Sequence, residues 1–370
     1  MDDRLVGRLL DLGAADATRI IEAATDIGLD ATVTAMFGEL LPRIDADLTV
    51  EYDLTLPAYQ ATHHIRLLPT RRAVESAEPA AAPGLRLRHG TAEFVDLFRA
   101  VFGGRHDLGV ALFDPDDQAV AKHLAASFAE RPGLAELASR HGSCKWGAHW
   151  GPTHYERYLA PLRDRRIKIL EIGVGGHHVA PGGESLRMWR DYFPRAQIYG
   201  VDLYDKRDVA EQRIRIFQGD QSDKRFLAEL VAETGPVDIV IDDGSHVNDH
   251  VLTAFRFLFP HLTDGGLYLI EDLQSSYWPA FGGVPDDRDD PRTTTGFLKT
   301  LVDGLQHQEF LAPEDYQPSY LDRSVVGVHV HHLFAVIEKG ANTEPSSKAN
   351  WMRYLDLNRP MAALEIGPQP

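Results

Sequence analysis

The sequence predicts an α/β protein in which a smaller mixed α/β domain precedes a parallel sheet covered by helices. Three observations lead to this expectation. The chain has 370 residues, which is more than one compact domain usually holds. Hydrophobic residues make up 44% and charged residues 25%, the mixture of an ordinary globular protein. After residue 142, short apolar segments alternate with amphipathic ones, a pattern typical of parallel strands joined by helices.

The composition disfavours several classes of partner. Lys and Arg number 38 against 55 Asp and Glu, a formal net charge of −17. Because so acidic a surface repels polyphosphate, we expect no nucleic-acid partner. The single cysteine, Cys144, rules out an intrachain disulfide framework and a cysteine-based metal site. No apolar run approaches the ~18 residues of a membrane span, and the N-terminus does not look like a secretory signal. We therefore expect a cytoplasmic protein without membrane contact.

Residues 1–142 are expected to form a mixed α/β domain, and they contain no recognisable catalytic motif. Strands interrupted at Pro57 are predicted within Glu51–Leu68, and a loop within Glu75–Gly84. Residues Thr91–Phe102 place four large apolar side chains on one helical stripe. Two further helices are predicted at Pro115–Glu130 and Leu134–Arg140.

Residues 143–370 are expected to form the second domain, which carries the parallel sheet. Its strands are predicted at Lys168–Ile172, Gln197–Val201, Arg213–Phe217, Asp238–Ile241 and Leu267–Ile270, with two more within Val325–Glu338. The helices between them are predicted at Glu184–Tyr192, Lys224–Ala232 and His250–Phe259. Ligands of such sheets bind beyond the carboxyl ends of the strands. The acidic residues at those ends are Glu171, Asp202, Asp242, Asp243, Glu271 and Asp272.

The first predicted strand runs into a glycine-rich turn, EIGVGG, in which Gly173 and Gly175 allow a ligand to approach the backbone closely. A dinucleotide-binding turn has the pattern G-x-G-x-x-G, but the third glycine position is occupied by His178. This departure weakens the case for NAD. It favours a ligand with a ribose and an amino-acid end but no phosphates, namely S-adenosylmethionine. The plain alternative is a tight turn of the kind any α/β protein contains.

Several residues near the strand ends suit that cofactor. Glu171 is placed to meet an ammonium group or an ordered water, and Asp202 to accept hydrogen bonds from both ribose hydroxyls. Asp220 follows the third strand, where the adenine amino group would lie. Trp146 is expected to cover the adenosine or the methionine end, although a packed hinge explains it equally well. The cofactor-binding candidates are Trp146, Glu171, Gly173, Gly175, Asp202, Asp220, Gln221 and Asp242.

The segments IDDGSH and IEDL place carboxylates at the ends of two neighbouring strands. Carboxylates this close repel one another unless a cation lies between them. An all-oxygen ligand set favours Mg²⁺, and we expect Asp243, Glu271 and Asp272 to be its ligands. Helix capping is the alternative, but it would account for Asp243 and not for the pair on the next strand.

His246 follows the predicted metal ligand Asp243 by three residues, and it is the candidate catalytic residue. An alcohol is a poor nucleophile because it holds its proton as tightly as water does, and a bound metal weakens that hold. Histidine titrates near neutral pH and suits the role of general base. His250, one helical turn further on, is the competing candidate.

The series KWG, EIGVGG, GVDLYDK, GDQSD, DIVIDDGSH and GGLYLIEDLQ resembles the metal-dependent sugar O-methyltransferases of antibiotic biosynthesis. The resemblance is dense from Lys145 to Gly340 and looser before that. It implies a Rossmann-like methyltransferase domain with an N-terminal auxiliary domain, the cofactors S-adenosylmethionine and Mg²⁺, and a homotetramer. The implied acceptor is a glycosylated polyketide or macrolide, methylated on the 2-hydroxyl of a deoxysugar or rhamnose. By position, the implied roles are metal ligand for Asp243, Glu271 and Asp272, general base for His246, and cofactor contact for Asp202 and Asp220.

Two other functions are compatible with a fold of this class. One is an NAD(P)-dependent sugar-modifying oxidoreductase, which would bind a nicotinamide cofactor and ignore S-adenosylmethionine. The other is a non-catalytic carbohydrate-binding or assembly protein. The latter gives no reason for three carboxylates at adjacent strand ends.

Overall fold

The computed structural model describes residues 3–80, 82–104, 118–176, 180–311, 316–353 and 357–358. The chain packs as two compact units, Met1–Asp220 and Gln221–Pro370. Strands β1 to β4 form a four-stranded sheet before residue 142, and strands β5 to β11 form a seven-stranded sheet after it. The predicted domain boundary at residues 142 and 143 thus separates the two sheets, whereas packing divides the chain later, and this boundary remains a prediction.

The smaller sheet has the strand order β3-β2-β1-β4. Its elements are β1 (Leu48–Leu56), β2 (Tyr59–Leu68), β3 (Ala73–Ser76) and β4 (Leu85–His89). Strand β1 pairs antiparallel with β2 and parallel with β4. Alternation along β1 buries Val50, Tyr52 and Leu54, because successive side chains of a strand point to opposite faces. Pro57 lies in the turn between β1 and β2, which confirms the predicted interruption.

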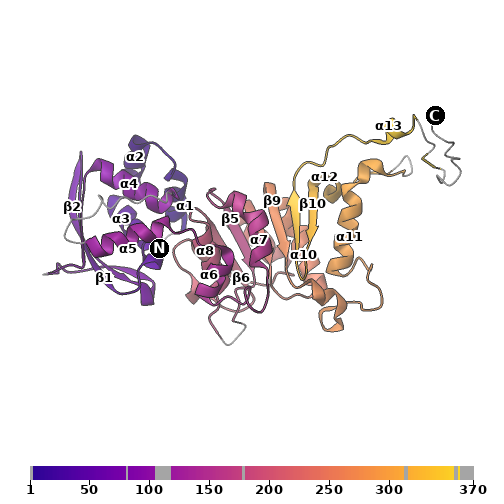
Figure 1. Cartoon of the computed structure of the whole chain (residues 1–370), viewed down its shortest axis with the longest axis horizontal. Helices are drawn as coiled ribbons and strands as arrows, with labels where there is room; N and C mark the ends of the chain where they lie inside the picture. Colours follow the sequence, from indigo (N-terminus) through magenta and orange to yellow (C-terminus); the bar gives the residue numbers. More distant parts are fainter. Residues whose placement is uncertain are drawn as a thin grey trace, which may run out of the picture. The chain divides into compact units, whose positions relative to one another are not determined.

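Helices pack against this sheet and complete the N-terminal core (Figure 1). They are α1 (Asp3–Leu12), α2 (Ala17–Ile27), α3 (Leu29–Gly38), α4 (Thr91–Phe102) and α5 (Gln118–Ala129). Helix α4 has the predicted bounds, and its Phe94, Phe98 and Phe102 are fully buried. Residues 105–117 lie outside the described residues, so the predicted helix start at Pro115 falls among them.

The first unit also contains three parallel strands of the larger sheet, in the order β5-β6-β7. They are β5 (Lys168–Ile172), β6 (Gln197–Asp202) and β7 (Ile214–Gln218). The helices of this part are α6 (Leu134–His141), α7 (Pro152–Leu159) and α8 (Glu184–Tyr192). All three strands and helices α6 and α8 lie within a residue or so of the predicted bounds.

The second unit contains the other four strands, in the order β10-β11-β9-β8. They are β8 (Val237–Asp242), β9 (Leu262–Ile270), β10 (Val325–Val330) and β11 (Ala335–Lys339). Strands β8 and β9 are parallel, and β11 is antiparallel to both β9 and β10. The two strands predicted in the tail are therefore confirmed. The helices are α9 (Lys224–Thr234), α10 (Asn248–Leu258), α11 (Thr294–Leu305), α12 (Tyr320–Ser324) and α13 (Lys348–Trp351).

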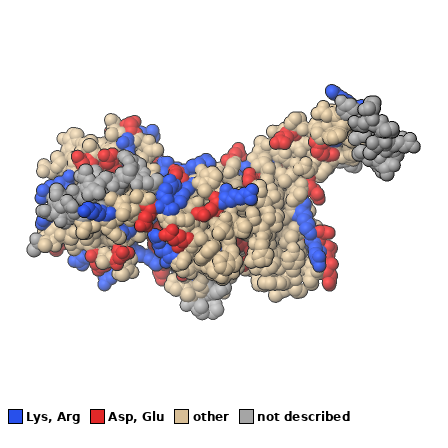
Figure 2. All heavy atoms as spheres, in the orientation of Figure 1, with Lys and Arg blue, Asp and Glu red and all other residues tan. Residues whose placement is uncertain are grey.

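The surface mixes charges of both signs. On the face shown in Figure 2, basic residues gather in the middle of the view beside acidic ones. Among the described residues, no helix has the length and apolar character that crossing a membrane requires.

Candidate active site

The predicted acidic cluster forms where β8 and β9 end. These parallel strands pair Asp242 with Ile270, and the Glu271 N–H donates to the Asp242 carbonyl over 2.9 Å. The ladder therefore continues to the point where Asp243 and Glu271 leave it. Ligand atoms of Asp243 and Glu271 lie within 4.8 Å of each other. The same limit holds among the ligand atoms of Asp243, Asp272 and His246.

His246 faces Asp272 across this cluster. Its Nε2 lies 3.2 Å from Asp272 Oδ2, with the two side chains 25% and 16% exposed. Both residues have left-handed backbone conformations, with φ of 56° and 54° respectively. Non-glycine residues in this region carry strain that persists where the surrounding structure imposes it, often at functional sites. The competing candidate His250 instead places Nδ1 3.1 Å from Ser245 Oγ.

Gln274 holds Asp272 of the cluster by a hydrogen bond, and the sequence analysis did not predict this role. Its Nε2 donates to Asp272 Oδ1 over 2.8 Å, so the two oxygens of Asp272 face Gln274 and His246. Its own Oε1 is buried without a hydrogen-bond partner among the described residues. The amide is thus held by its single bond to Asp272. It fixes the orientation of a predicted metal ligand, as the outer partners of metal sites do.

Asn248 ties together the loops around the cluster. It is buried at the start of α10, and its Nδ2 donates to the carbonyls of Ser275 and Phe281 over 3.2 and 2.9 Å. Its Oδ1 accepts from the Thr294 N–H over 2.7 Å. One amide therefore satisfies three backbone groups from segments that follow Asp272 in the chain.

We expect Asn248→Ala to lower the free energy of unfolding by about 2–3 kcal/mol, because buried backbone groups lose their partners. Urea denaturation followed by circular dichroism measures this change. Asp249→Ala is the matched control, since Asp249 is the next residue of the same helix and is exposed. Equal midpoints for the two variants would contradict this role of Asn248.

In the first unit, the glycine turn after β5 has positive φ angles, a backbone conformation that glycine adopts readily. Gly173, Gly175 and Gly176 have φ of 94°, 82° and 70°, and a Cβ on Gly176 would lie 2.4 Å from the Ala180 carbonyl oxygen. Asp202, at the end of β6, accepts hydrogen bonds from the N–H groups of Val174 and Tyr204 over 3.0 and 2.9 Å. Asp202 therefore fixes the turn. His178, in the third glycine position of a dinucleotide pattern, lies outside the described residues.

Glu171 is fully buried, and the ammonium group that it meets belongs to the chain. Lys145 Nζ lies 3.2 Å from Glu171 Oε1, and both side chains are almost inaccessible. The other oxygen accepts from Ser185 Oγ and Trp189 Nε1 over 2.9 and 3.0 Å. Sequence reasoning missed Lys145, although the KWG motif was the available signal. Trp146 of that motif is half-buried and stacks edge-on against Trp150, with ring centroids 4.9 Å apart.

Asp242 and Gln221 support the loop that carries Asp243 and His246. Gln221 Nε2 and Tyr268 Oη donate to the two Asp242 oxygens over 3.0 and 3.2 Å. Gln221 Oε1 accepts from the Ser245 N–H over 2.8 Å. Burial raises the pKa of Asp242 to about 7. Both oxygens of Asp242 thus have protein partners, and a cofactor contact of Asp242, Gln221 or the half-buried Asp220 remains a prediction.

Residues 170–273 match the model of a methyltransferase domain. Mycinamicin VI 2''-O-methyltransferase of Micromonospora griseorubida is 45% identical, over 68% of this chain and 69% of the relative. Demethylmacrocin O-methyltransferase of Streptomyces fradiae is 40% identical, over 92% of each chain. A tetracenomycin rhamnosyl 2'-O-methyltransferase of Streptomyces olivaceus is 41% identical, over 93% and 97%. The chain belongs to the antibiotic sugar O-methyltransferases. This membership confirms the resemblance and the expected class of enzyme.

A solved methyltransferase of the mycinamycin biosynthetic pathway shares the fold over 93% of this chain. The structure of the MycE methyltransferase in complex with Mg, SAH and mycinamycin VI is 35% identical to this chain. The two superpose with a TM-score of 0.78 over 93% of this chain and 95% of that one. This likeness confirms the predicted methyltransferase domain with an auxiliary domain before it. The predicted cofactors, S-adenosylmethionine and Mg²⁺, agree with the groups named for MycE, which disfavours the NAD(P)-dependent alternative.

Proposed function

We propose that this enzyme transfers a methyl group from S-adenosylmethionine to the 2-hydroxyl of a deoxysugar or rhamnose on a macrolide or other polyketide. In this proposal Asp243, Glu271 and Asp272 bind Mg²⁺, and His246 is the general base. The observation that carries the proposal is the meeting of Asp243, His246 and Asp272 within 4.8 Å, beside the paired ends of β8 and β9.

The donor set fits a hard divalent cation. Carboxylate oxygens from two neighbouring strand ends are the ligands that Mg²⁺ prefers. The bond from Gln274 to Asp272 Oδ1 leaves Asp272 Oδ2 on the side of His246. When bound, Mg²⁺ supplies positive charge that acidifies a neighbouring hydroxyl.

His246 then accepts the hydroxyl proton at Nε2. Asp272 Oδ2, 3.2 Å away, stabilises the positive charge that the imidazole acquires. The deprotonated sugar oxygen attacks the methyl carbon of the sulfonium in line. A carbon–oxygen bond forms as the carbon–sulfur bond breaks, and S-adenosylhomocysteine leaves with the electron pair. Positioning and electrostatics account for most of the expected rate enhancement.

The cofactor half of the proposal rests on the turn after β5. The turn at Gly173 and Gly175 has no side chains that would block the nucleoside, and the carboxylate of Asp202 at the end of β6 is the proposed acceptor for its ribose hydroxyls. Trp146 supplies an aromatic face. The other proposed contacts are Glu171, Asp220, Gln221 and Asp242. Asp202, Glu171 and Asp242 all bond to protein groups as well, so each would share its oxygens with the cofactor.

The choice of the 2-hydroxyl rests on relatives. The mycinamicin and tetracenomycin enzymes named for 2-hydroxyl methylation are 45% and 41% identical to this chain. Two relatives named for methylation at position 3 are 40% and 34% identical. These sequence identities favour methylation at the 2-hydroxyl, and the position of the methyl group in the product tests this choice.

We also propose a cytoplasmic homotetramer in which the auxiliary domain of one subunit helps to cover the active site of another. The family resemblance supports this arrangement. Light scattering coupled to size-exclusion chromatography tests it, and a monomeric mass would contradict it. The exposed thiol of Cys144 suits a reducing compartment.

The function is tested by incubating the enzyme with S-adenosylmethionine, Mg²⁺ and a panel of macrolides and rhamnosylated polyketides that lack sugar methyl groups. Mass spectrometry detects the gain of one methyl group, and NMR of the product locates it. We expect a 2-O-methyl sugar. Transfer to the 3-hydroxyl would overturn the regiochemistry alone. Absence of transfer to every acceptor, together with thermal stabilisation by NAD(P), would overturn the proposed function.

A further inference from the structure

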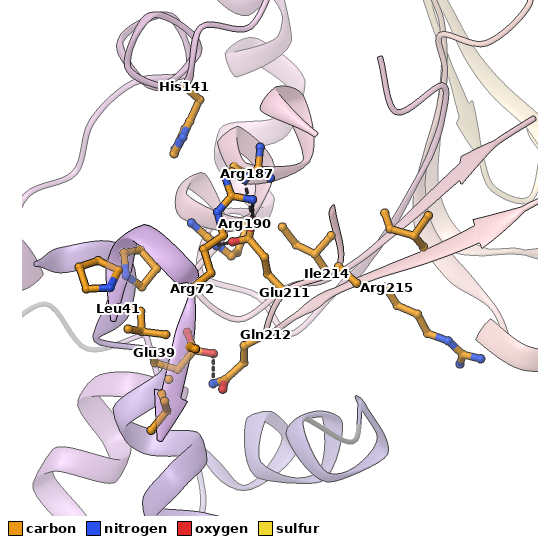
Figure 3. A pocket seen from close by; sticks show the side chains of 17 residues that line it. Glu39, Leu41, Arg72, His141, Arg187, Arg190, Glu211, Gln212, Ile214 and Arg215 are labelled. Atoms are coloured by element: carbon orange, nitrogen blue, oxygen red, sulfur yellow. Dashed lines mark hydrogen bonds and ion pairs between the residues drawn. The ribbon is translucent and has the colours of Figure 1, made fainter. Parts of the chain in front are cut away.

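A cavity of about 590 Å³ lies within the first unit, and its lining shares no residue with the candidate active site. One side of its lining comes from the auxiliary segment (residues 1–142) and includes Glu39 and Arg72. The other side comes from α8 and from the segment that leads into β7, including Arg187, Arg190 and Glu211 (Figure 3).

Three arginines converge on one carboxylate in this cavity. Glu211 Oε1 lies 2.7 Å from Arg72 Nη1 and 2.6 Å from Arg187 Nε. Its Oε2 lies 2.5 Å from Arg190 Nη1. A carboxylate carries one negative charge, so it cannot neutralise three guanidinium groups.

The lining consequently has an excess of positive charge. The printed ion pairs join four arginines to three carboxylates, namely Arg72, Arg187, Arg190 and Arg213 to Glu39, Glu211 and Asp191. This network has one positive charge in excess when the histidine is neutral. This surplus occurs in a chain whose formal net charge is −17, so the general acidity of the protein does not explain it.

The arginines retain donors for a ligand. Arg190 and Arg187 are largely buried, which holds their guanidinium groups in place and reduces their solvation. Arg72 contacts Glu211 through one nitrogen, and its side chain remains 47% exposed. Its backbone is left-handed, with φ of 51°, an uncommon conformation for a non-glycine residue. The chain thus bends sharply where Arg72 reaches the cavity.

The position of the cavity separates it from methyl transfer. It adjoins Ile214 and Ile216 at the beginning of β7. Ligands of parallel sheets bind at the opposite, carboxyl ends of the strands, and for β7 that end leads to Asp220. A ligand here would contact both the auxiliary segment and the sheet-bearing part of the first unit.

We propose that this cavity binds a phosphoryl group, either free phosphate or the phosphate of a small metabolite. Guanidinium groups match the oxygens of phosphate and donate charge-assisted hydrogen bonds to them. A negatively charged ligand would balance the excess positive charge of the network. The volume exceeds the needs of phosphate alone, so a phosphorylated sugar or nucleotide also fits the proposal.

Isothermal titration of the full-length protein with inorganic phosphate tests this site, in low-salt buffer with saturating S-adenosylhomocysteine to occupy the cofactor site. We expect one phosphate per chain. Affinity should fall about tenfold in Arg72→Gln, the effect of losing a charge-assisted hydrogen bond. Arg71→Gln is the matched control, because it removes the same charge from an exposed neighbour. It should change affinity less than about twofold, since screened surface charges act weakly.

A second titration uses Arg72→Lys, which keeps the charge but not the planar fork, and it should give intermediate affinity. Parallel titrations with glucose 1-phosphate and adenosine monophosphate distinguish the sources of the group. If glucose 1-phosphate or adenosine monophosphate binds more tightly than inorganic phosphate, the ligand is a phosphorylated metabolite. If the three compounds bind equally, the phosphate group itself is the ligand. The proposal is overturned if phosphate does not bind at concentrations up to about 10 mM, which corresponds to a binding free energy weaker than about −3 kcal/mol, or if Arg71→Gln and Arg72→Gln weaken binding equally.

Discussion

Replacing His246 with alanine is expected to lower the turnover number for methyl transfer by about 10²–10⁴-fold, the usual contribution of a general base. Its Nε2 is the group beside Asp272 in the acidic cluster, and alanine leaves no acceptor for the hydroxyl proton. The affinity for S-adenosylmethionine should change less than about twofold, because His246 is not among the cofactor-binding candidates. Single-turnover kinetics and isothermal titration measure the two quantities separately.

His250→Ala is the matched control for this experiment. His250 is four residues away in the same segment, and its ring meets Ser245 Oγ instead of the cluster. We expect it to retain most of the activity. If His250→Ala loses the activity and His246→Ala keeps it, the base has been assigned to the wrong histidine. A slow His246→Ala variant that also fails to bind the cofactor would indicate a damaged fold instead of a missing base.

Replacing Asp243 with asparagine is expected to weaken the binding of Mg²⁺ by at least about 100-fold and to reduce methyl transfer to a similar degree. Changes to the outer partners of a metal site already cost 10–100-fold, and this change removes the charge of a direct ligand. Asparagine keeps the volume of the side chain at the end of β8, so the paired strands should remain folded. Titration calorimetry with Mg²⁺ and activity at increasing Mg²⁺ measure the effect.

The control for Asp243→Asn is Asp249→Asn, which removes an equal charge from an exposed position in the first turn of α10. We expect it to leave both metal affinity and activity within about twofold of the unmodified enzyme, since exposed charges are screened. Unchanged metal affinity in Asp243→Asn would reject this residue as a ligand. Full activity in the presence of EDTA would reject the metal altogether.

Hydrophobic periodicity predicted the parallel strands well because each is a short apolar run between turns. Strand β9 is the exception, since it begins at Leu262 whereas Leu267 was the predicted start. Gly265 and Gly266 interrupt its apolar pattern, but the backbone pairing with β8 continues to Leu262. Strand β3, Ala73–Ser76, overlaps the predicted loop Glu75–Gly84. It is a short edge strand held by backbone pairing with β2, which leaves little hydrophobic signal in the sequence.

The residues that the acidic cluster brings together were predictable because each follows a strand directly. Their supports were not. Gln274 and Asn248 are single polar residues outside any motif, and a single polar residue carries no signal of burial. The convergence of Arg72, Arg187 and Arg190 on Glu211 was equally invisible, because Arg72 lies more than a hundred residues before the other three.

The central claim of this account is that Asp243, Glu271 and Asp272 together hold a divalent cation beside His246. A crystal structure of the enzyme soaked with Mn²⁺, with anomalous data collected at the manganese edge, tests it most directly. We predict one strong anomalous peak within bonding distance of all three carboxylates, with His246 facing the open coordination positions. A peak bound elsewhere, or no peak at the ends of β8 and β9, would contradict the account.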